Sequence, residues 1–360
     1  MSGLELARRF YRAVVQPRLV GVEHAAALLG DGSEVLGYDD AVSTDHDFGP
    51  RLQVFLPARA DPAAVHGALA DLPAEFEGFA VVFSDTDRHG GLARHQVEVT
   101  TAAEFFAARL GVDPAGGMTL ADWLLSPTQR LATLTAGAVF HDPDGVLYRR
   151  RAALRWYPTD VWRYVLAAGW LRVGQEEPFV GRAGSRGDGL GSAVLAARLV
   201  RDLMRLAFLV ERRWAPYGKW LGRAFTDLPL AATVGPHLGA ALAASGWRER
   251  QGQVCAAASL LAAATNRLGL AAPVDPAARQ FHQRDIQVLD AERFTVALTA
   301  AVTDPDVAAL LDGLGHRAGR AVGALPGAID QAVDSTDILE HPGRCRAAAP
   351  ALGLDGRTPL

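Results

Sequence analysis

The sequence predicts an α+β chain in which a mixed sheet with helices is followed by an all-helical bundle. Residues 1–150 alternate helix-like runs with short strand-like runs, whereas residues 151–345 are rich in Ala and Leu and hold few strand-like runs. The chain has 360 residues, which is more than one domain usually contains, so we expect two domains. Residues 346–360 are predicted to form a flexible tail.

The elements of the first part follow from hydrophobic spacing and from capping residues. Apolar residues at helical spacing predict one or two helices over residues 4–29, which a glycine-rich turn ends. Asp61 before a proline, and the Thr101–Glu104 capping box, predict the starts of two later helices. Strand-like runs cover residues 34–38, 46–56, 79–83 and 94–99.

The second part reads as a helical bundle. Residues 160–173 form one predicted helix, and residues 190–214 form a longer one with leucines on one side. Most of residues 230–330 is helix-like, with breaks at prolines and glycines. We therefore expect an all-α domain of bundle type.

Charge and composition exclude several classes of protein. The net charge of −4 and the pI near 6.2 give no basic field, which disfavours nucleic acid as a partner. The opening MSGLELARRF lacks the apolar core of a signal peptide, and prolines interrupt the nearly uncharged residues 228–247. The two cysteines form neither a metal cage nor a disulfide framework. These features predict a cytoplasmic protein without a membrane partner.

The basic residues are almost all arginine. Of 36 basic residues, Lys219 alone is a lysine. A GC-rich genome explains the excess of arginine, so the remaining lysine is a candidate for a position that a guanidinium cannot fill. An ammonium is a compact point charge, whereas a guanidinium is a wide planar fork. The alternative is that one lysine falls somewhere by chance.

One segment carries the residues of a phosphate and metal site. Gly32 and Ser33, which we expect on a helix-to-strand turn, precede Asp45 and Asp47 at the start of the next predicted strand. Alternate residues of a strand face the same side, so the two aspartates project together. Paired carboxylates suit one or two Mg²⁺ ions, which bridge the phosphates of a nucleotide. The glycine lets the backbone approach a phosphate, and the serine hydroxyl can bond it.

This Gly-Ser and Asp-x-Asp arrangement resembles the polymerase-beta-type nucleotidyltransferase superfamily. The resemblance implies a third carboxylate on a later strand, which ligates metal or acts as the base toward an acceptor hydroxyl. Glu98, in the strand-like run 94–99, is the best candidate, because an acid in an apolar strand needs a reason. Asp85 and Asp87 are the alternatives, in a turn-like run. A glutamate at this place resembles the small-molecule adenylyltransferases of antibiotic resistance.

A closer resemblance spans about residues 20–230. The runs GYDDAVSTDHDFGPRL, GAVFHDPDG, RWYPTDVW, GQEEPFVGRAG, ARLVRDLMRLAFLVERRWAPYGKW and LGRAF resemble the bacterial family called domain of unknown function 4037. This family implies a nucleotidyltransferase-like N-terminal domain over residues 1–150 and a helical C-terminal domain. It implies no substrate.

The helical part supplies candidate ligands for the donor. Related adenylyltransferases place a lysine of the helical domain on the triphosphate, which makes Lys219 a phosphate ligand by resemblance. Tyr217 beside it is a candidate for stacking on the base. Arg198, Arg201 and Arg205 lie on one helix face, where they contact phosphate or form an ion-pair network within the helix.

Three functions fit these residues. The first is a Mg²⁺-dependent nucleotidyltransferase that moves a nucleotide, with ATP the expected donor among nucleoside triphosphates, to a hydroxyl of a small molecule or other acceptor. The second is a nucleotide-binding regulatory or antitoxin-like protein of the same fold that acts on a protein partner. The third is a glycosyltransferase that uses Asp-x-Asp on a sugar nucleotide, which the upstream Gly-Ser disfavours.

Overall fold

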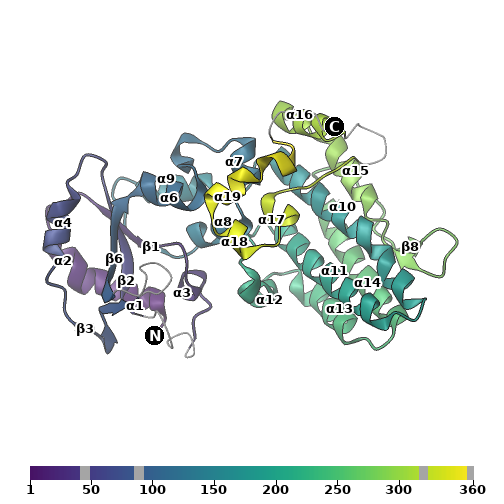
Figure 1. Cartoon of the computed structure of the whole chain (residues 1–360), viewed down its shortest axis with the longest axis horizontal. Helices are drawn as coiled ribbons and strands as arrows, with labels where there is room; N and C mark the ends of the chain where they lie inside the picture. Colours follow the sequence, from purple (N-terminus) through teal and green to yellow (C-terminus); the bar gives the residue numbers. More distant parts are fainter. Residues whose placement is uncertain (41–48, 85–92, 316–322, 355–360) are drawn as a thin grey trace. The chain divides into compact units, whose positions relative to one another are not determined.

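A computed structural model describes residues 1–40, 49–84, 93–315 and 323–354. The chain divides into two compact units. The sheet unit comprises residues 1–118 and 130–155, and the helical unit comprises residues 119–129 and 156–360. Figure 1 labels the helices and strands of both units.

Five strands of the described residues form one mixed sheet in the sheet unit, in the order β5-β6-β2-β1-β7. Strand β2 runs parallel to β6, and the other neighbouring pairs are antiparallel. The strands are β1 (Ala25–Leu28), β2 (Arg51–Leu56), β5 (Val82–Ser84), β6 (Ala93–Thr101) and β7 (Ala138–His141).

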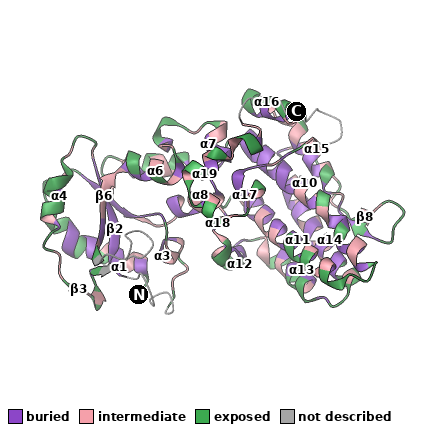
Figure 2. Cartoon of the chain, in the orientation of Figure 1, coloured by how far each residue is buried: buried purple, intermediate pink, exposed green. Residues whose placement is uncertain are grey.

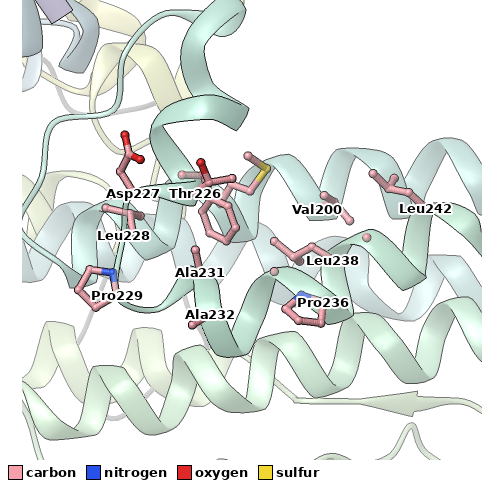
Figure 3. A pocket seen from close by; sticks show the side chains of 14 residues that line it. Val200, Thr226, Asp227, Leu228, Pro229, Ala231, Ala232, Pro236, Leu238 and Leu242 are labelled. Carbon is pink, nitrogen blue, oxygen red and sulfur yellow. The ribbon is translucent and has the colours of Figure 1, made fainter. Parts of the chain in front are cut away.

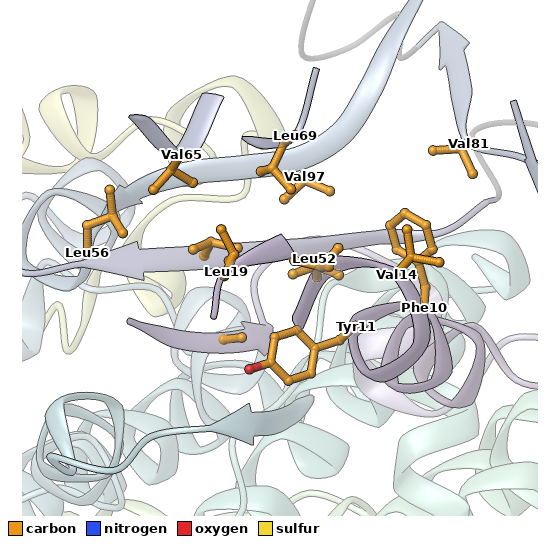
Figure 4. Packing of buried hydrophobic residues seen from close by; sticks show 13 residues of the cluster. Phe10, Tyr11, Val14, Leu19, Leu52, Leu56, Val65, Leu69, Val81 and Val97 are labelled. Atoms are coloured by element: carbon orange, nitrogen blue, oxygen red, sulfur yellow. The ribbon is translucent and has the colours of Figure 1, made fainter. Parts of the chain in front are cut away.

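The two faces of this sheet pack against different helices. One face meets α1 (Gly3–Phe10), the π-helix Tyr11–Val15 that continues it and α4 (Pro62–Ala68), as the buried cluster in Figure 4 shows. Leu52, Val54 and Leu56 point to this side. Phe55 points to the other side, where its ring lies 5.1 Å from that of Phe105 on α6 (Ala102–Leu110). The sheet therefore has one face with a large apolar core and a second face that changes character along β2.

The remaining elements of the sheet unit are short. They are α2 (Gln16–Arg18), α3 (Ser33–Leu36), β3 (Glu75–Phe76), β4 (Phe79–Ala80), a 3-10 turn (Pro114–Gly116) and α9 (Val146–Ala153). Helix α8 (Thr128–Thr135) begins in the helical unit and ends in the sheet unit.

The helical unit is built on two long helices, α10 (Thr159–Gly184) and α11 (Gly189–Val210). Both have a buried face at the centre of the unit (Figure 2). Around them lie α7 (Leu120–Leu124), α12 (Gly218–Thr226), α13 (Ala231–Ala243), α14 (Trp247–Arg267), α15 (Glu292–Ala300), α16 (Pro305–Gly313), α17 (Ile329–Ala332), α18 (Thr336–Leu339) and the hairpin β8 (Arg279–Gln280) and β9 (Gln287–Val288). No described helix combines the length and the apolar composition that a bilayer-spanning segment requires.

The predicted fold class, a mixed sheet followed by a helical region, is confirmed. Asp61 caps α4, and the Thr101–Glu104 capping box opens α6 as expected. Two predictions around the phosphate turn are wrong. Residues 25–28 form the fully buried strand β1, and residues 33–36 form helix α3 where a strand was expected. Three successive alanines suggest a helix, but hydrogen bonding between two neighbouring strands overrides that local propensity.

The prediction of a flexible tail from residue 346 is also wrong for its described part. Helix α19 (Pro342–Ala347) and a 3-10 turn (Ala349–Leu352) continue the fold. Leu352 is fully buried, in a cluster with Leu125, Ile329 and Cys345. Residues 346–354 pack onto the unit because this leucine completes a small core. No local sequence pattern predicts that core, since its members come from distant parts of the chain.

Candidate functional site

The second face of the sheet changes from apolar to polar along β2. Phe55, Gln53 and Arg51 alternate onto this face, and their partners on β6 are Thr100, Glu98 and Gln96. Gln53 and Arg51 are both buried, at 2% and 9% exposure. Buried polar side chains need hydrogen-bond partners, and here these partners come from the turn that follows β1.

Gln53 and Arg51 fasten that turn to the sheet. The Gln53 amide accepts a hydrogen bond from the Leu29 backbone N–H at 3.0 Å and donates to the Leu29 carbonyl. Arg51 Nε donates to Glu34 Oε1 at 2.6 Å, and its Nη2 donates to the Asp31 carbonyl at 2.5 Å. The turn from β1 into α3 is thus held by side chains of β2.

Gly32 and Ser33 lie in this turn, between a strand and a helix rather than between a helix and a strand. Gly32 has a φ of +136°, which disfavours any residue with a side chain. A Cβ at Gly32 would clash with Arg51 Nη2 and would lie 2.5 Å from Glu34 Oε2. The glycine is therefore required by the arginine that packs over it, in addition to any role in approaching a phosphate.

Glu98 lies on the same face as this turn. Its carboxylate is 39% exposed and accepts a hydrogen bond from Arg109 Nη2 at 3.3 Å. Arg109 also lies 3.6 Å over the Phe105 ring, and its Nε is 3.2 Å from where a Gly30 Cβ would be. Arg109 therefore connects Glu98 to the turn after β1. The structure brings two of the predicted site residues to one sheet face, with Gly32 in the turn after β1 and Glu98 on β6, on either side of β2.

The other predicted carboxylates lie outside the described residues. These are Asp45 and Asp47, and the alternatives Asp85 and Asp87. Within the described ranges, no three His, Cys, Asp or Glu side chains are grouped closely enough to hold a metal ion. The described part of the sheet unit therefore offers one of the three predicted ligands, Glu98. Its partly exposed carboxylate is the oxygen donor that Mg²⁺ prefers.

Lys219 and Tyr217 lie at the start of α12 in the helical unit. Tyr217 is the N-cap residue, and Lys219 is the second residue of the helix. Lys219 is exposed, and its Nζ lies 5.0 Å from the Trp220 ring centroid. No acidic side chain of the described residues pairs with it, and the first turn of α12 holds no acid. A lysine opposes the helix dipole at this end, so an anion there would relieve an unfavourable charge.

The three arginines of α11 are engaged elsewhere. Arg198 pairs with Glu176 at 2.8 Å, and Arg201 pairs with both oxygens of Asp334. Arg205 Nη1 donates to the Asp330 carbonyl at 2.7 Å. These partners lie on other elements, so an ion-pair network within the helix is wrong. These contacts engage all three arginine side chains, so a bound phosphate is not needed to explain their presence on α11.

The structure also holds a buried acid in α10 that the sequence analysis did not predict. Glu177 is 5% exposed, and its oxygens accept hydrogen bonds from the Leu289 N–H at 2.6 Å and the Ala291 N–H at 2.9 Å. Burial raises the pKa of Glu177 to about 7, although the two N–H groups act to lower it. The signal was present, because Val173 and Val180 place this position on the apolar side of the helix.

An apolar groove of about 680 Å³ runs between α11, the end of α12 and α13. Val200, Leu228, Leu238 and Leu242 line it, with Asp227 at one end (Figure 3). None of the predicted site residues is among its lining residues. The groove lacks the cations that a triphosphate needs.

The family model described as Domain of unknown function (DUF4037) matches residues 123–221. It is the family that the sequence resembles, and the match confirms that resemblance over this segment. The matched residues run from α7 through α10 and α11 to the start of α12, and they include Tyr217 and Lys219. No curated protein and no solved structure gives a significant match.

Proposed function

We propose that the chain is a Mg²⁺-dependent nucleotidyltransferase, which moves a nucleotide from a nucleoside triphosphate to the hydroxyl of an acceptor. ATP is the expected donor. One observation carries the proposal. The Gly32–Ser33 turn, which follows β1, and Glu98 on β6 lie at one polar sheet face, on either side of β2. Asp45 and Asp47 stand in the sequence just before β2.

Each residue has a chemical part in this proposal. Asp45 and Asp47 would hold Mg²⁺, which when bound neutralises charge on the phosphates, and Glu98 would be either a further ligand or the base. Ser33 would donate a hydrogen bond to a phosphate oxygen, and Lys219 would supply a cation to the triphosphate. Tyr217 would stack on the base.

The reaction is a displacement at the α-phosphorus. The acceptor hydroxyl oxygen attacks this phosphorus, the bond to the bridging oxygen breaks, and pyrophosphate leaves with that bonding pair. In the role of base, Glu98 would receive the hydroxyl proton. Arg109 restrains the Glu98 carboxylate, which suits a group that must meet the acceptor in one geometry.

Nucleotide binding tests the donor site before an acceptor is known. Wild type and Asp47→Asn would be titrated by calorimetry with ATP, GTP, CTP and UTP, with and without Mg²⁺. We expect Mg²⁺-dependent binding of one nucleotide by wild type and its loss in the variant. Absence of binding for all four nucleotides by a folded wild type would overturn the proposal.

Pyrophosphate release then separates the enzyme from a regulatory protein of the same fold. With the bound nucleotide and a panel of hydroxyl-bearing small molecules, we expect wild type to release pyrophosphate. Asp47→Asn should lower the rate of release by several powers of ten, and each power of ten corresponds to about 1.4 kcal/mol of activation free energy. Binding without release, together with a protein that co-purifies with the chain, would favour the regulatory or antitoxin-like function.

A further inference from the structure

Arg51 is a buried cation whose role the proposed chemistry does not yet include. Its side chain is 11% exposed and lies on the polar sheet face, at the start of β2. Two of its nitrogens are occupied, because Nε and Nη2 bond Glu34 and the Asp31 carbonyl. These bonds hold the guanidinium plane against Gly32.

The third nitrogen of the guanidinium remains available. Among the described residues, Arg51 Nη1 has no hydrogen-bond acceptor. The buried polar atoms that lack a partner do not include Nη1, so solvent can reach it. A rigidly held guanidinium with an available N–H edge is suited to an anionic oxygen, because little side-chain freedom is lost on binding.

We propose that Arg51 contacts the donor, with Nη1–H donated to a phosphate oxygen seated at the Gly32–Ser33 turn. This inference rests on the proposed function, which places the phosphates at that turn. Glu34 acts as the positioning residue, since it fixes the guanidinium and balances its charge inside the protein. The arginine is thereby part of the donor site, although it belongs to neither recognised motif.

A double variant tests this contact without leaving a buried charge alone. Arg51→Gln with Glu34→Gln removes the ion pair as a unit. Arg150→Gln with Asp113→Asn is the matched control, because it removes a bidentate arginine–carboxylate pair elsewhere in the same unit. Calorimetry would measure the Kd of Mg-ATP and of Mg-pyrophosphate for each protein.

We expect the Arg51/Glu34 variant to bind both ligands about tenfold to a hundredfold more weakly than wild type, as for a lost charge-assisted hydrogen bond. The control should stay within twofold. If the double variant does not fold, Arg51→Lys serves instead, because it keeps a positive charge opposite Glu34 but loses the planar guanidinium. We expect Arg51→Lys to bind both ligands at least several-fold more weakly than wild type.

Two results would overturn the inference, and they differ in what else they affect. Binding of both ligands within twofold of wild type by the folded variants would remove Arg51 from the donor site and leave the proposed function in place. No binding of either ligand by wild type would overturn the proposed function and the role of Arg51 with it.

Discussion

Glu98 on β6 and Gln53 on β2 are register partners in the parallel pair of the sheet. Their side chains therefore share one face, and Gln53 also bonds the backbone of Leu29, at the end of β1. These contacts link β6, β2 and the end of β1 at the polar part of this sheet face. The relationship explains how a carboxylate and a glycine turn far apart in the sequence come to lie at one sheet face, on either side of β2.

Replacement of Glu98 should affect chemistry more than folding. For Glu98→Gln we expect pyrophosphate release to fall by several powers of ten, because the variant cannot take a proton. Its free energy of unfolding should change by less than about 1 kcal/mol, since the carboxylate is partly exposed. Glu75→Gln, at an exposed position of β3, is the control. Unchanged turnover in Glu98→Gln would exclude this residue as base and as essential ligand.

Gly32 and Arg51 should be coupled in stability. Gly32→Ala is expected to destabilise the wild type, because its Cβ would meet Arg51 Nη2 and the Glu34 carboxylate. In an Arg51→Ala, Glu34→Ala background, the clash is gone and only the strain of the positive φ remains, at about 1–2 kcal/mol. Urea unfolding of the four proteins gives the coupling, expected at about 1–3 kcal/mol. An equal cost of Gly32→Ala in both backgrounds would show that this packing does not select glycine.

Lys219 and Arg201 should differ in nucleotide binding. Lys219→Met is expected to weaken the Kd of Mg-ATP about tenfold or more, because the variant loses an exposed ammonium that pairs with no acid of the described residues. Arg201→Met should leave that Kd within twofold, because Asp334 already engages both guanidinium ends. Calorimetry on the two variants decides this, and equal weakening by both would return the α11 arginines to the donor site.

The last described segment should contribute to stability. Leu352→Ala is expected to cost about 2–5 kcal/mol, because a fully buried leucine leaves a cavity in its cluster. Leu190→Ala is the matched control, since Leu190 is 79% exposed and its loss should cost little. Denaturant unfolding measures both. A cost for Leu352→Ala as small as that of the control would mean that this segment is not packed in solution.

Glu177 should make stability fall as the pH rises. Its pKa is raised from 4.5 to about 7 in the folded chain, so the folded state holds the proton more tightly than the unfolded state. The associated stability is present below about pH 4.5 and is lost between there and pH 7, by about 3 kcal/mol.

Glu177→Gln resembles the protonated acid and should lack this loss. We therefore expect the variant to gain stability relative to wild type as the pH rises from 4.5 to 7, in urea unfolding at each pH. Glu75→Gln should show a difference from wild type that does not vary with pH. A difference for Glu177→Gln that does not vary with pH would show that the pKa of Glu177 is not raised in the folded chain.

Helices of the chain were predictable because their signals are local. The capping box of Thr101 and Glu104 and the cap at Asp61 lie within one helical turn of what they stabilise. The long helices α10 and α11 were recognised by apolar periodicity over many residues, and α10 runs further than expected, to Gly184. Glu98 was singled out for the same kind of reason, as an acid within a strand-like run.

The sequence by itself thus determined the fold class, the order of the main helices and the candidate Gly32–Ser33 and Glu98 positions. The tertiary structure decided that residues 25–28 are an internal strand of the sheet, that Leu352 completes a core and that Arg51 packs over Gly32. It also decided the partners of Arg201 and Arg205. Strand pairing, core completion and ion pairing join residues far apart in the chain, so their energies depend on contacts that no local window of sequence contains.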